Sequence, residues 1–348
     1  MPEELDEHTH IAIYGAGTLG CFVGGLLLLA GRRVTFLARP RIAAELAVHG
    51  LLLTDFTGLQ ARVIPEALDV RSRADFLGEA GLVLVTVKSG STEAAADEIA
   101  ALAGPCVPAV SLQNGIGNPG ILRGRLGPDR VLGGMVAFNV VHKGQGHFHR
   151  GTSGGVIIEA GRPDILRLLS VPGLEVSPTT NIAGVQWGKL LFNLNNGLNA
   201  LSGVPLRRQL ESRAWRRLLA GQIAEALEIL DAAGIQPVTA NKIPPRLIPR
   251  ILRLPDVLFA LAARPMLQID PEARSSTWED LMLGRPTEIG RFQGAIVRLA
   301  QEHGLKAPLS EAILRLVKEA EEARAGPPGL SPQDIARRMP APAAAHAS

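Results

Sequence analysis

The chain has 348 residues, and its 36 basic and 33 acidic residues give a formal charge of +3 at pH 7. This balance, the scattered basic residues and an aromatic content of only 4% give no support for a nucleic-acid partner, and we expect none. The length exceeds that of one ordinary domain and predicts two domains with a sizeable core. Nothing in the composition is typical of fibrous or largely disordered proteins.

The cysteine content and the apolar runs of the sequence indicate the cellular compartment in which the protein is expected. Cys21 and Cys106 are too few and too isolated for a disulfide framework or a metal site, so we expect two packed thiols in a reducing compartment. Residues 3–7 are mostly acidic, whereas a signal peptide would be basic and then apolar. The most apolar run, residues 22–30, is too short to span a bilayer. We therefore expect a soluble cytoplasmic protein without a membrane partner.

The first predicted elements form a strand–turn–helix–strand unit. Residues 11–14 predict a buried strand, and the GxGxxG turn follows as Gly15-Ala16-Gly17-Thr18-Leu19-Gly20. The first glycine permits the tight turn, the second lets a pyrophosphate approach the backbone, and the third lets the next helix pack closely. That helix, predicted over residues 18–30 and ended by Gly31, directs free N–H groups at the phosphates. With a second strand at 34–37, this order predicts a dinucleotide site.

Arg39 indicates which dinucleotide is bound. The end of the second strand faces the adenosine ribose, where NAD-binding sequences usually carry an acidic residue. This chain has Arg39 there, with Arg41 close by. A guanidinium binds a 2′-phosphate through a planar, permanently charged fork, so we expect NADP (NADPH) as the cofactor. The alternative is a solvated loop charge.

Further alternation of strands and helices predicts an α/β domain of the Rossmann type, with a parallel sheet covered on both faces. Its next elements are a strand at 81–87, a helix at 91–102 and a strand at 106–112. Short runs between glycines then predict antiparallel strands at a sheet edge, within 131–141, 146–150 and 155–159.

Lys88 and Asn114 follow two of these strands, and ligands of open α/β sheets bind beyond the carboxyl ends of the strands. Lys88 can reach cofactor phosphates or ribose, and Asn114 can place an amide near the nicotinamide or the substrate. The alternatives are a solvated strand end and a simple turn. His147 and His149 share one face of a predicted strand. We expect an exposed edge-strand face there and no metal site.

The second half of the chain predicts an all-helical domain. Helical patterns dominate from about residue 181, over 187–201, 213–233, 244–261, 275–283, 289–303 and 309–323. We therefore divide the chain into an N-terminal domain at 1–180 and a helical domain at 181–325. The tail at 326–348 is rich in proline and alanine and is expected to be frayed or disordered.

The helix at 187–201 carries the second strongest signal. At about 100° per residue, Lys189, Asn193 and Asn196 fall in one narrow sector. The opposite side is filled by Leu190, Leu191, Leu194, Leu198 and Leu201. Because asparagine is a poor helix former, the amides favour a functional face over a solvated amphipathic helix, which is the alternative.

Two further helix starts carry polar side chains. Ser275 and Ser276 form a natural N-cap pair, and Glu288 stands where a carboxylate favours a helix dipole. Spacing does not show whether they face Lys189. A nicotinamide cofactor, a lysine and amides together indicate reduction of a 2-oxo acid, in which hydride adds to the carbonyl carbon and an ammonium protonates the alkoxide.

In these residues the chain resembles the ketopantoate reductases (2-dehydropantoate 2-reductases) from its start to about residue 320. The matches occur in the family's order: GAGTLG at 15–20, Arg39, Val87-Lys88, Gln113-Asn114-Gly115, Gly188-Lys189-Leu190 with Asn193, Ser275-Ser276 and Thr287-Glu288-Ile289. The resemblance implies a Rossmann domain followed by a helical domain. It also implies NADPH-dependent reduction of 2-dehydropantoate to pantoate, on the pathway to pantothenate and coenzyme A.

The resemblance also assigns roles to single residues. It implies that Lys189 is the general acid and that Glu288 binds the substrate hydroxyl or positions Lys189. Asn193 and Ser276 match substrate-binding positions. Asn114 matches a residue near both cofactor and substrate, and Lys88 matches a lysine that contacts the cofactor.

The chain departs from the family pattern at Gly197, Thr277, Gly290 and Gln293. The family's second asparagine is replaced by Gly197, and the adjacent Asn196 could substitute for it in substrate binding. Because these positions belong to the substrate end, two alternatives stay open. One is a reductase or opine-type dehydrogenase for another 2-oxo acid, and the other is a non-catalytic NADP-binding sensor. The sequence leaves a homodimer open.

Overall fold

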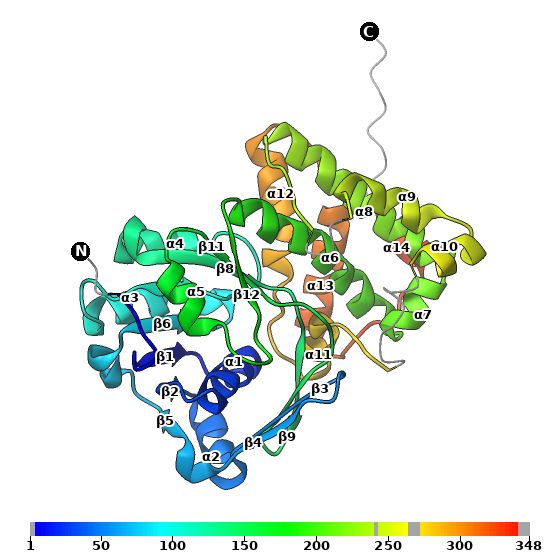
Figure 1. The fold of residues 1–348 in the computed structure, drawn as a ribbon. Coiled ribbons are helices and arrows are strands. Elements are labelled where there is room, and N and C mark those ends of the chain that lie inside the picture. Colours follow the sequence, from blue (N-terminus) through cyan, green and yellow to red (C-terminus); the bar gives the residue numbers. More distant parts are fainter. Residues whose placement is uncertain (1–3, 240–242, 264–271, 340–348) are drawn as a thin grey trace. The chain divides into compact units, whose positions relative to one another are not determined.

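The computed structural model describes residues 4–239, 243–263 and 272–339. Its contacts divide the chain into two compact units, Met1–Ile182 and Ala183–Ser348 (Figure 1). In the described part of the chain, no helix has the length and apolarity needed to cross a membrane.

The first unit is built on an eight-stranded sheet with the strand order β12-β11-β8-β7-β6-β1-β2-β5. The six strands from β8 to β5 run parallel, β11 pairs antiparallel with β8, and β12 pairs parallel with β11. The strand order reverses beside β1, as it does in dinucleotide-binding sheets. This confirms the predicted Rossmann-type α/β fold. The bounds are β1 Ile11–Tyr14, β2 Val34–Leu37, β5 Asp69–Arg71, β6 Leu82–Val85, β7 Ala109–Ser111, β8 Val131–Val136, β11 Val156–Glu159 and β12 Val176–Thr179.

Helices cover both faces of this sheet because alternate side chains of its central strands point to opposite sides. Ile11 and Ile13 of β1 belong to an apolar cluster that includes α1 and α5. Ala12 and Tyr14 belong to a second cluster, which includes α3 and α4. The bounds are α1 Thr18–Leu29, α2 Pro40–His49, α3 Thr92–Leu102, α4 Asn118–Leu126 and α5 Pro163–Leu169, with short 3-10 helices η1 Pro65–Ala67, η2 Asp75–Glu79, η3 Ser89–Ser91 and η4 Pro128–Arg130.

A separate four-stranded sheet corrects part of the expected topology. It consists of β3 Leu51–Asp55, β4 Gln60–Val63, β9 Val140–Gly144 and β10 His147–Arg150, in the order β4-β3-β10-β9. The prediction that all strands within 131–159 lie antiparallel at one sheet edge was therefore wrong, because β8 runs parallel to β7 and β10 lies between β3 and β9. Gly25 of α1 allows close packing here, since an added Cβ would stand 2.8 Å from Leu53 Cδ1.

The histidine pair lies on β10, which is an interior strand of this small sheet. The expectation of an edge strand was therefore wrong. His147 Nε2 and His149 Nδ1 hydrogen-bond with Thr54 Oγ1 at 2.8 and 2.7 Å. Within the described ranges, no three His, Cys, Asp or Glu side chains are grouped so that they could hold a metal ion. Cys21 is buried as expected, but Cys106 is exposed, so the prediction of a packed thiol was wrong for Cys106.

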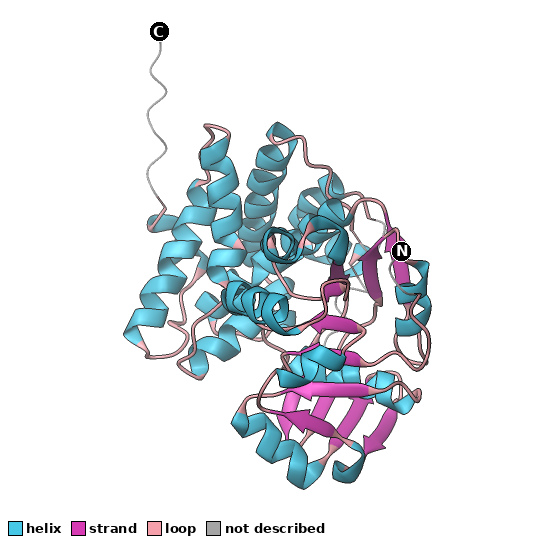
Figure 2. Ribbon diagram, turned by 90° about the vertical axis from the view of Figure 1, so that its left-hand side faces the viewer, coloured by secondary structure: helices cyan, strands magenta, loops and turns pink. Residues whose placement is uncertain are grey.

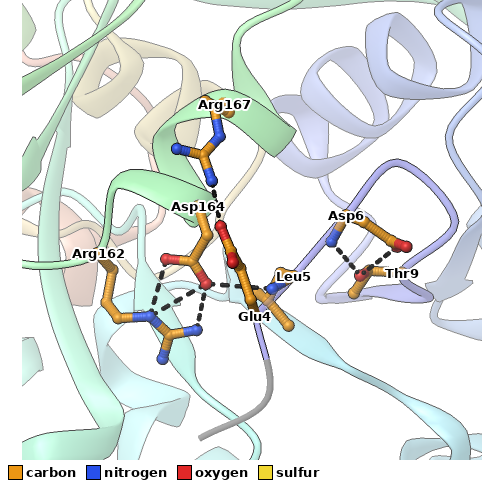
Figure 3. A network of polar contacts seen from close by, with 7 residues as sticks. All are labelled: Glu4, Leu5, Asp6, Thr9, Arg162, Asp164 and Arg167. Carbon is orange, nitrogen blue, oxygen red and sulfur yellow. Dashed lines mark hydrogen bonds and ion pairs between the residues drawn. The ribbon is translucent and has the colours of Figure 1, made fainter.

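The N-terminal segment is tied to α5 by the polar network in Figure 3. The Leu5 N–H donates to Asp164 Oδ2 at 3.2 Å, and Arg167 donates to Glu4 at 2.6 Å. Arg162 donates to the same Asp164 carboxylate at 2.6 Å, which lowers the pKa of Asp164 to about 2.

In the second unit, the regular elements formed by the described residues are all helices, joined by loops (Figure 2). The bounds are α6 Ile182–Ser202, α7 Leu206–Glu211, α8 Arg213–Ala232, η5 Pro245–Leu247, α9 Ile248–Arg253, α10 Asp256–Ala262, α11 Ser276–Met282, η7 Ile289–Arg291, α12 Gln293–Glu302, α13 Pro308–Ala323 and α14 Pro332–Arg337.

Three helical expectations need correction. The single helix predicted over 289–303 is divided into η7 and α12, with Phe292 outside helical conformation between them. The single helix predicted over 244–261 is divided into η5, α9 and α10, with Pro255 between α9 and α10 disfavouring helical conformation in the residue before it. The tail predicted to be disordered from residue 326 contains α14. A capping box between Ser331 and Asp334 begins this helix, and Ile335 is fully buried. Residues 340–348 of that prediction lie outside the described residues.

Candidate functional site

The glycine turn after β1 has the geometry that its sequence predicts. Gly15 has a φ of +108°, and a Cβ there would stand 2.6 Å from Val87 Cγ1. A Cβ on Gly20 would stand 2.5 Å from the Gly15 carbonyl oxygen, whereas one on Gly17 would meet nothing closer than 4.0 Å. Gly15 and Gly20 thus permit the turn and the close helix packing, and Gly17 leaves the backbone open to a ligand.

The N-terminus of α1 is available to an anion. Gly17 is its N-cap residue, and no side chain caps the first N–H groups. The turn itself is held by the Ala16 N–H, which donates to the Leu37 carbonyl at 2.8 Å, and by Thr86 Oγ1, which donates to the Gly15 carbonyl at 2.7 Å. Uncapped N–H groups on a fixed turn bind phosphate well.

Arg39 lies just beyond the carboxyl end of β2, at the N-cap position of α2. Its side chain is exposed and makes no ion pair with any residue that the structure describes. Arg41 differs, because it pairs with Glu45 at 3.8 Å. The glycine turn, the helix terminus and Arg39 therefore fit the pyrophosphate and the 2′-phosphate of NADP.

Lys88 and Asn114 are exposed at the carboxyl ends of β6 and β7, on the same edge of the sheet as the glycine turn. Hydrogen bonds from buried side chains hold the loops that carry Lys88 and Asn114. Gln113 Nε2 donates to the Val87 carbonyl at 3.1 Å, and Asn118 Nδ2 donates to the Asn114 carbonyl at 2.8 Å. The sequence did not indicate these supporting roles of the buried Gln113 and Asn118, although Gln113 directly precedes Asn114 and Asn118 follows it by four residues.

On α6 the described residues confirm the predicted two-sided pattern. The leucines of its apolar side are all at most 1% exposed: Leu190, Leu191, Leu194, Leu198 and Leu201. Lys189, Asn193 and Asn196 are partly exposed. The structure thus brings these three polar side chains onto one face of one helix.

The other two asparagines of α6 have a structural role. Asn199 is fully buried; its Nδ2 donates to the Val204 carbonyl at 2.9 Å, and its Oδ1 accepts from the Ser275 N–H at 2.9 Å. Asn195 is also buried and donates to Gln209 Oε1 at 3.4 Å. These bonds tie α6 to α7 and to the start of α11, a role that the sequence did not reveal.

Lys189 and Glu288 are coupled electrostatically. Burial lowers the pKa of the Lys189 ammonium to about 8, and the negative charge of Glu288 acts in the opposite direction. At neutral pH the lysine is therefore mainly protonated, yet it gives up a proton more readily than an exposed lysine.

The serine pair divides into a cap and an exposed residue. Ser275 Oγ accepts from the Trp278 N–H at 3.2 Å and donates to the Asn196 carbonyl at 3.1 Å. Ser275 therefore caps α11, as one interpretation of the sequence held. Ser276 is exposed and is the member of the pair that can reach a ligand.

Glu288 is held in place through its neighbour. The Thr287 N–H donates to Glu321 Oε1 on α13 at 2.7 Å, and Thr287 Oγ1 bonds to the same oxygen. Burial alone would raise the pKa of Glu321, but hydrogen bonds from Lys318 and Thr287 hold it below its ordinary value. A charged Glu321 thus anchors the segment that carries Glu288.

The departures from the family pattern are mostly interior. Gly197, Thr277 and Gln293 are buried, and Gly290 is partly exposed. The interior positions thus lie in the packing of the helical unit, whereas Asn193, Asn196 and Ser276 are accessible on the surface of this unit.

Both halves of the chain match models of one family. The model described as ketopantoate reductase PanE/ApbA matches residues 11–163, and the model of the C-terminal part of the same family matches residues 181–321. Together these matches span most of the chain.

Named relatives and solved structures agree with the family models. The 2-dehydropantoate 2-reductase of Archaeoglobus fulgidus is 26% identical, over 89% of this chain and 97% of the relative. The enzyme of the same name from Mesorhizobium japonicum is 28% identical, over 88% and 96%. The crystal structure of a PanE/ApbA family ketopantoate reductase from Ralstonia eutropha JMP134 superimposes with a TM-score of 0.76 at 28% identity, over 90% of this chain and 99% of that one.

Proposed function

The chain belongs to the ketopantoate reductase family, and we propose that it reduces 2-dehydropantoate, a 2-oxo acid, to pantoate with NADPH. The observation that carries this proposal is the half-buried Lys189, whose ammonium feels the charge of Glu288 and which shares a helix face with Asn193 and Asn196. An oxidoreductase of this type needs a proton donor and hydrogen-bonding groups for the substrate.

NADPH, when bound, supplies a hydride to the carbonyl carbon of the substrate. The open backbone at Gly17 and the N-terminus of α1 would bind its pyrophosphate. Arg39 would pair with the 2′-phosphate, and Lys88 and Asn114 would bind the parts of the cofactor that extend along the sheet edge.

Lys189 supplies the proton in the proposed reaction. Its ammonium donates a hydrogen bond to the oxo oxygen and then transfers a proton to that oxygen as negative charge develops there. Carbonyl carbon and oxygen thus gain one hydride and one proton, which gives the hydroxyl of the product. A pKa of about 8 suits this role, because the group is protonated at neutral pH and is still a competent acid. Glu288 keeps Lys189 protonated.

The partly exposed amides of α6 and the exposed hydroxyl of Ser276 orient the substrate in this proposal. Asn193 and Asn196 present carboxamides on the Lys189 face of α6, and Ser276 presents a hydroxyl at the start of α11. Such groups bind a carboxylate and a hydroxyl, the two substituents that distinguish 2-dehydropantoate from a simple ketone.

Loss of nicotinamide absorbance when 2-dehydropantoate is added to the protein and NADPH tests the proposal. Lys189→Met keeps an unbranched side chain without the charge and should lower kcat by about a thousandfold, while NADPH binding, followed by fluorescence, stays unchanged. The matched control is Lys306→Met, an exposed lysine of the same unit, which should retain full activity.

A panel of 2-oxo acids, with and without an amine, tests the substrate. Clear preference for 2-dehydropantoate in kcat/KM supports the proposal. Tenfold or greater preference for another acid would assign a different substrate. Tight NADPH binding without turnover of any acid would favour a sensor.

A further inference from the structure

The side chain of Gln293 extends from α12 to α6 and lies beside Gly197. Gln293 is fully buried at the start of α12, and its Nε2 donates to the Leu194 carbonyl of α6 at 2.8 Å. A Cβ on Gly197 would stand 2.8 Å from this Nε2 and 3.0 Å from Ile289 Cδ1. It would also stand 2.8 Å from Ile313 Cγ2. The missing side chain at residue 197 therefore lets the segment that begins at Ile289 approach α6 closely.

This segment is continuous with Glu288. Glu288 is the N-cap residue of η7, and its carbonyl accepts from the Arg291 N–H at 2.8 Å. Ile289 follows it directly and is fully buried. A displacement of η7 from α6 would thus carry Glu288 with it. The charge of Glu288 acts on Lys189 and opposes the effect of burial on its pKa.

We propose that Gln293 and Gly197 are positioning residues, which together fix the separation of η7 from α6 and thereby the place of Glu288 relative to Lys189. This inference rests on the proposed role of Lys189 as the proton donor. Gln293 and Gly197 themselves contact neither substrate nor cofactor in this role.

The glutamine is poorly explained by stability alone. Its Oε1 is buried and has no hydrogen-bond partner in the described part of the chain. A buried acceptor without a partner is costly, and an apolar side chain of similar length would avoid that cost. The bond from Nε2 to α6 is what an apolar residue cannot replace.

The test measures the pKa of Lys189 without any substrate. The full-length protein is acylated with acetic anhydride over a range of pH, and the extent of Lys189 modification is read by mass spectrometry. Gln293→Met keeps an unbranched side chain but removes the bond to Leu194, and Gly197→Ala places a Cβ 2.8 Å from Gln293 Nε2 and 3.0 Å from Ile289 Cδ1, which should push η7 away from α6. Both should lower the pKa of Lys189, by up to about one pH unit, because the Glu288 charge is withdrawn. The control Gly290→Ala should not, since a Cβ there meets nothing within 4 Å.

A double variant separates this mechanism from general loosening. Glu288→Gln alone should lower the pKa of Lys189, and adding Gln293→Met should lower it no further, because the two changes act through one carboxylate. A pKa that is unchanged or raised in Gln293→Met, or an additional fall in the double variant, would overturn the inference. Thermal melting shows whether each variant is folded, and Gln293→Met keeps the test decisive if Gly197→Ala fails to fold.

The measurement of the Lys189 pKa needs no turnover, so a failure of this inference and a failure of the proposed function can be told apart. A lowered Lys189 pKa in a protein that reduces no 2-oxo acid would support the positioning role and contradict the reductase. Turnover of 2-dehydropantoate with an unmoved Lys189 pKa would do the reverse. In an active enzyme, Gln293→Met should also shift the falling limb of the kcat profile to lower pH.

Discussion

Gly188 packs directly against the backbone at Val238, since a Cβ on residue 188 would stand only 1.9 Å from the Val238 carbonyl oxygen. The Val238 N–H in turn donates to the Gly184 carbonyl at 2.8 Å. The helix turn that carries Lys189 thus packs against the loop that contains Val238. Glycine at 188 is required by this close approach, because a backbone carbonyl cannot move aside as a flexible side chain can.

We therefore expect Gly188→Ala to lower the free energy of unfolding by about 2 kcal/mol or more through overpacking. Urea denaturation measures this change. Gly124→Ala is the matched control, because Gly124 also lies within a helix but a Cβ there meets nothing within 4 Å. An equally stable Gly188→Ala variant would show that residues 235–239 do not pack on α6 in solution.

The pH dependence of turnover should report Lys189. The general acid must be protonated, and its pKa is lowered to about 8, so kcat should fall as the pH rises through about 8. Lys189→Arg is the comparison, because a guanidinium keeps its proton over this pH range. In the residual activity of this variant, the fall of kcat at high pH should therefore disappear. A falling limb that persists in Lys189→Arg would assign the titration to another group.

Arg39→Ala should weaken NADPH binding about ten- to a hundredfold and leave NADH binding nearly unchanged, because only NADPH carries the 2′-phosphate. Isothermal titration with both cofactors measures the difference. Arg41→Ala is the control, since Arg41 pairs with Glu45 and should matter less. Equal losses for the two cofactors in Arg39→Ala would remove the 2′-phosphate assignment.

Asp55, on strand β3 of the four-stranded sheet, should make the stability of the fold depend on pH in the acid range. Burial alone would raise the pKa of its carboxyl, but hydrogen bonds from Leu59, Thr57 and Arg150 hold it well below its ordinary value. Arg150 Nη2 lies 2.5 Å from Asp55 Oδ2. A carboxyl with a depressed folded-state pKa stabilises the fold above its unfolded-state pKa of about 4, and this contribution is lost as the pH falls further.

Asp55→Asn should therefore cost about 3 kcal/mol near neutral pH, because it leaves Arg150 without its carboxylate. The difference in the free energy of unfolding between this variant and the original chain should be smaller at about pH 3. Urea denaturation at both pH values tests this. A difference that stays constant with pH would show that the charge of Asp55 contributes nothing.

The first βαβ unit could be predicted almost to the residue. Strands at 11–14 and 34–37 occur where expected, and α1 ends one residue earlier than predicted. The signals for these elements are local, since buried strands, helix periodicity and a left-handed glycine each act within a few neighbouring residues. The leucine side of α6 was predictable for the same reason.

Local sequence signals did not predict which strands pair, nor which of several similar polar residues have a structural role. Nothing in residues 147–150 says that they pair with residues 52–55, because the pairing depends on a surface formed by a distant segment. The four asparagines of α6 look alike in sequence, yet Asn199 is buried and binds α7 and α11 while Asn193 is partly exposed.

By itself, the sequence determined the glycine turn, Arg39 after the second strand and the polar face that carries Lys189, because periodicity and residue chemistry define these features locally. Only the tertiary structure decided what Gly188, Gly197 and Gln293 do. Their roles come from backbone and side chains of segments about 50 to 100 residues away, which folding brings within van der Waals distance.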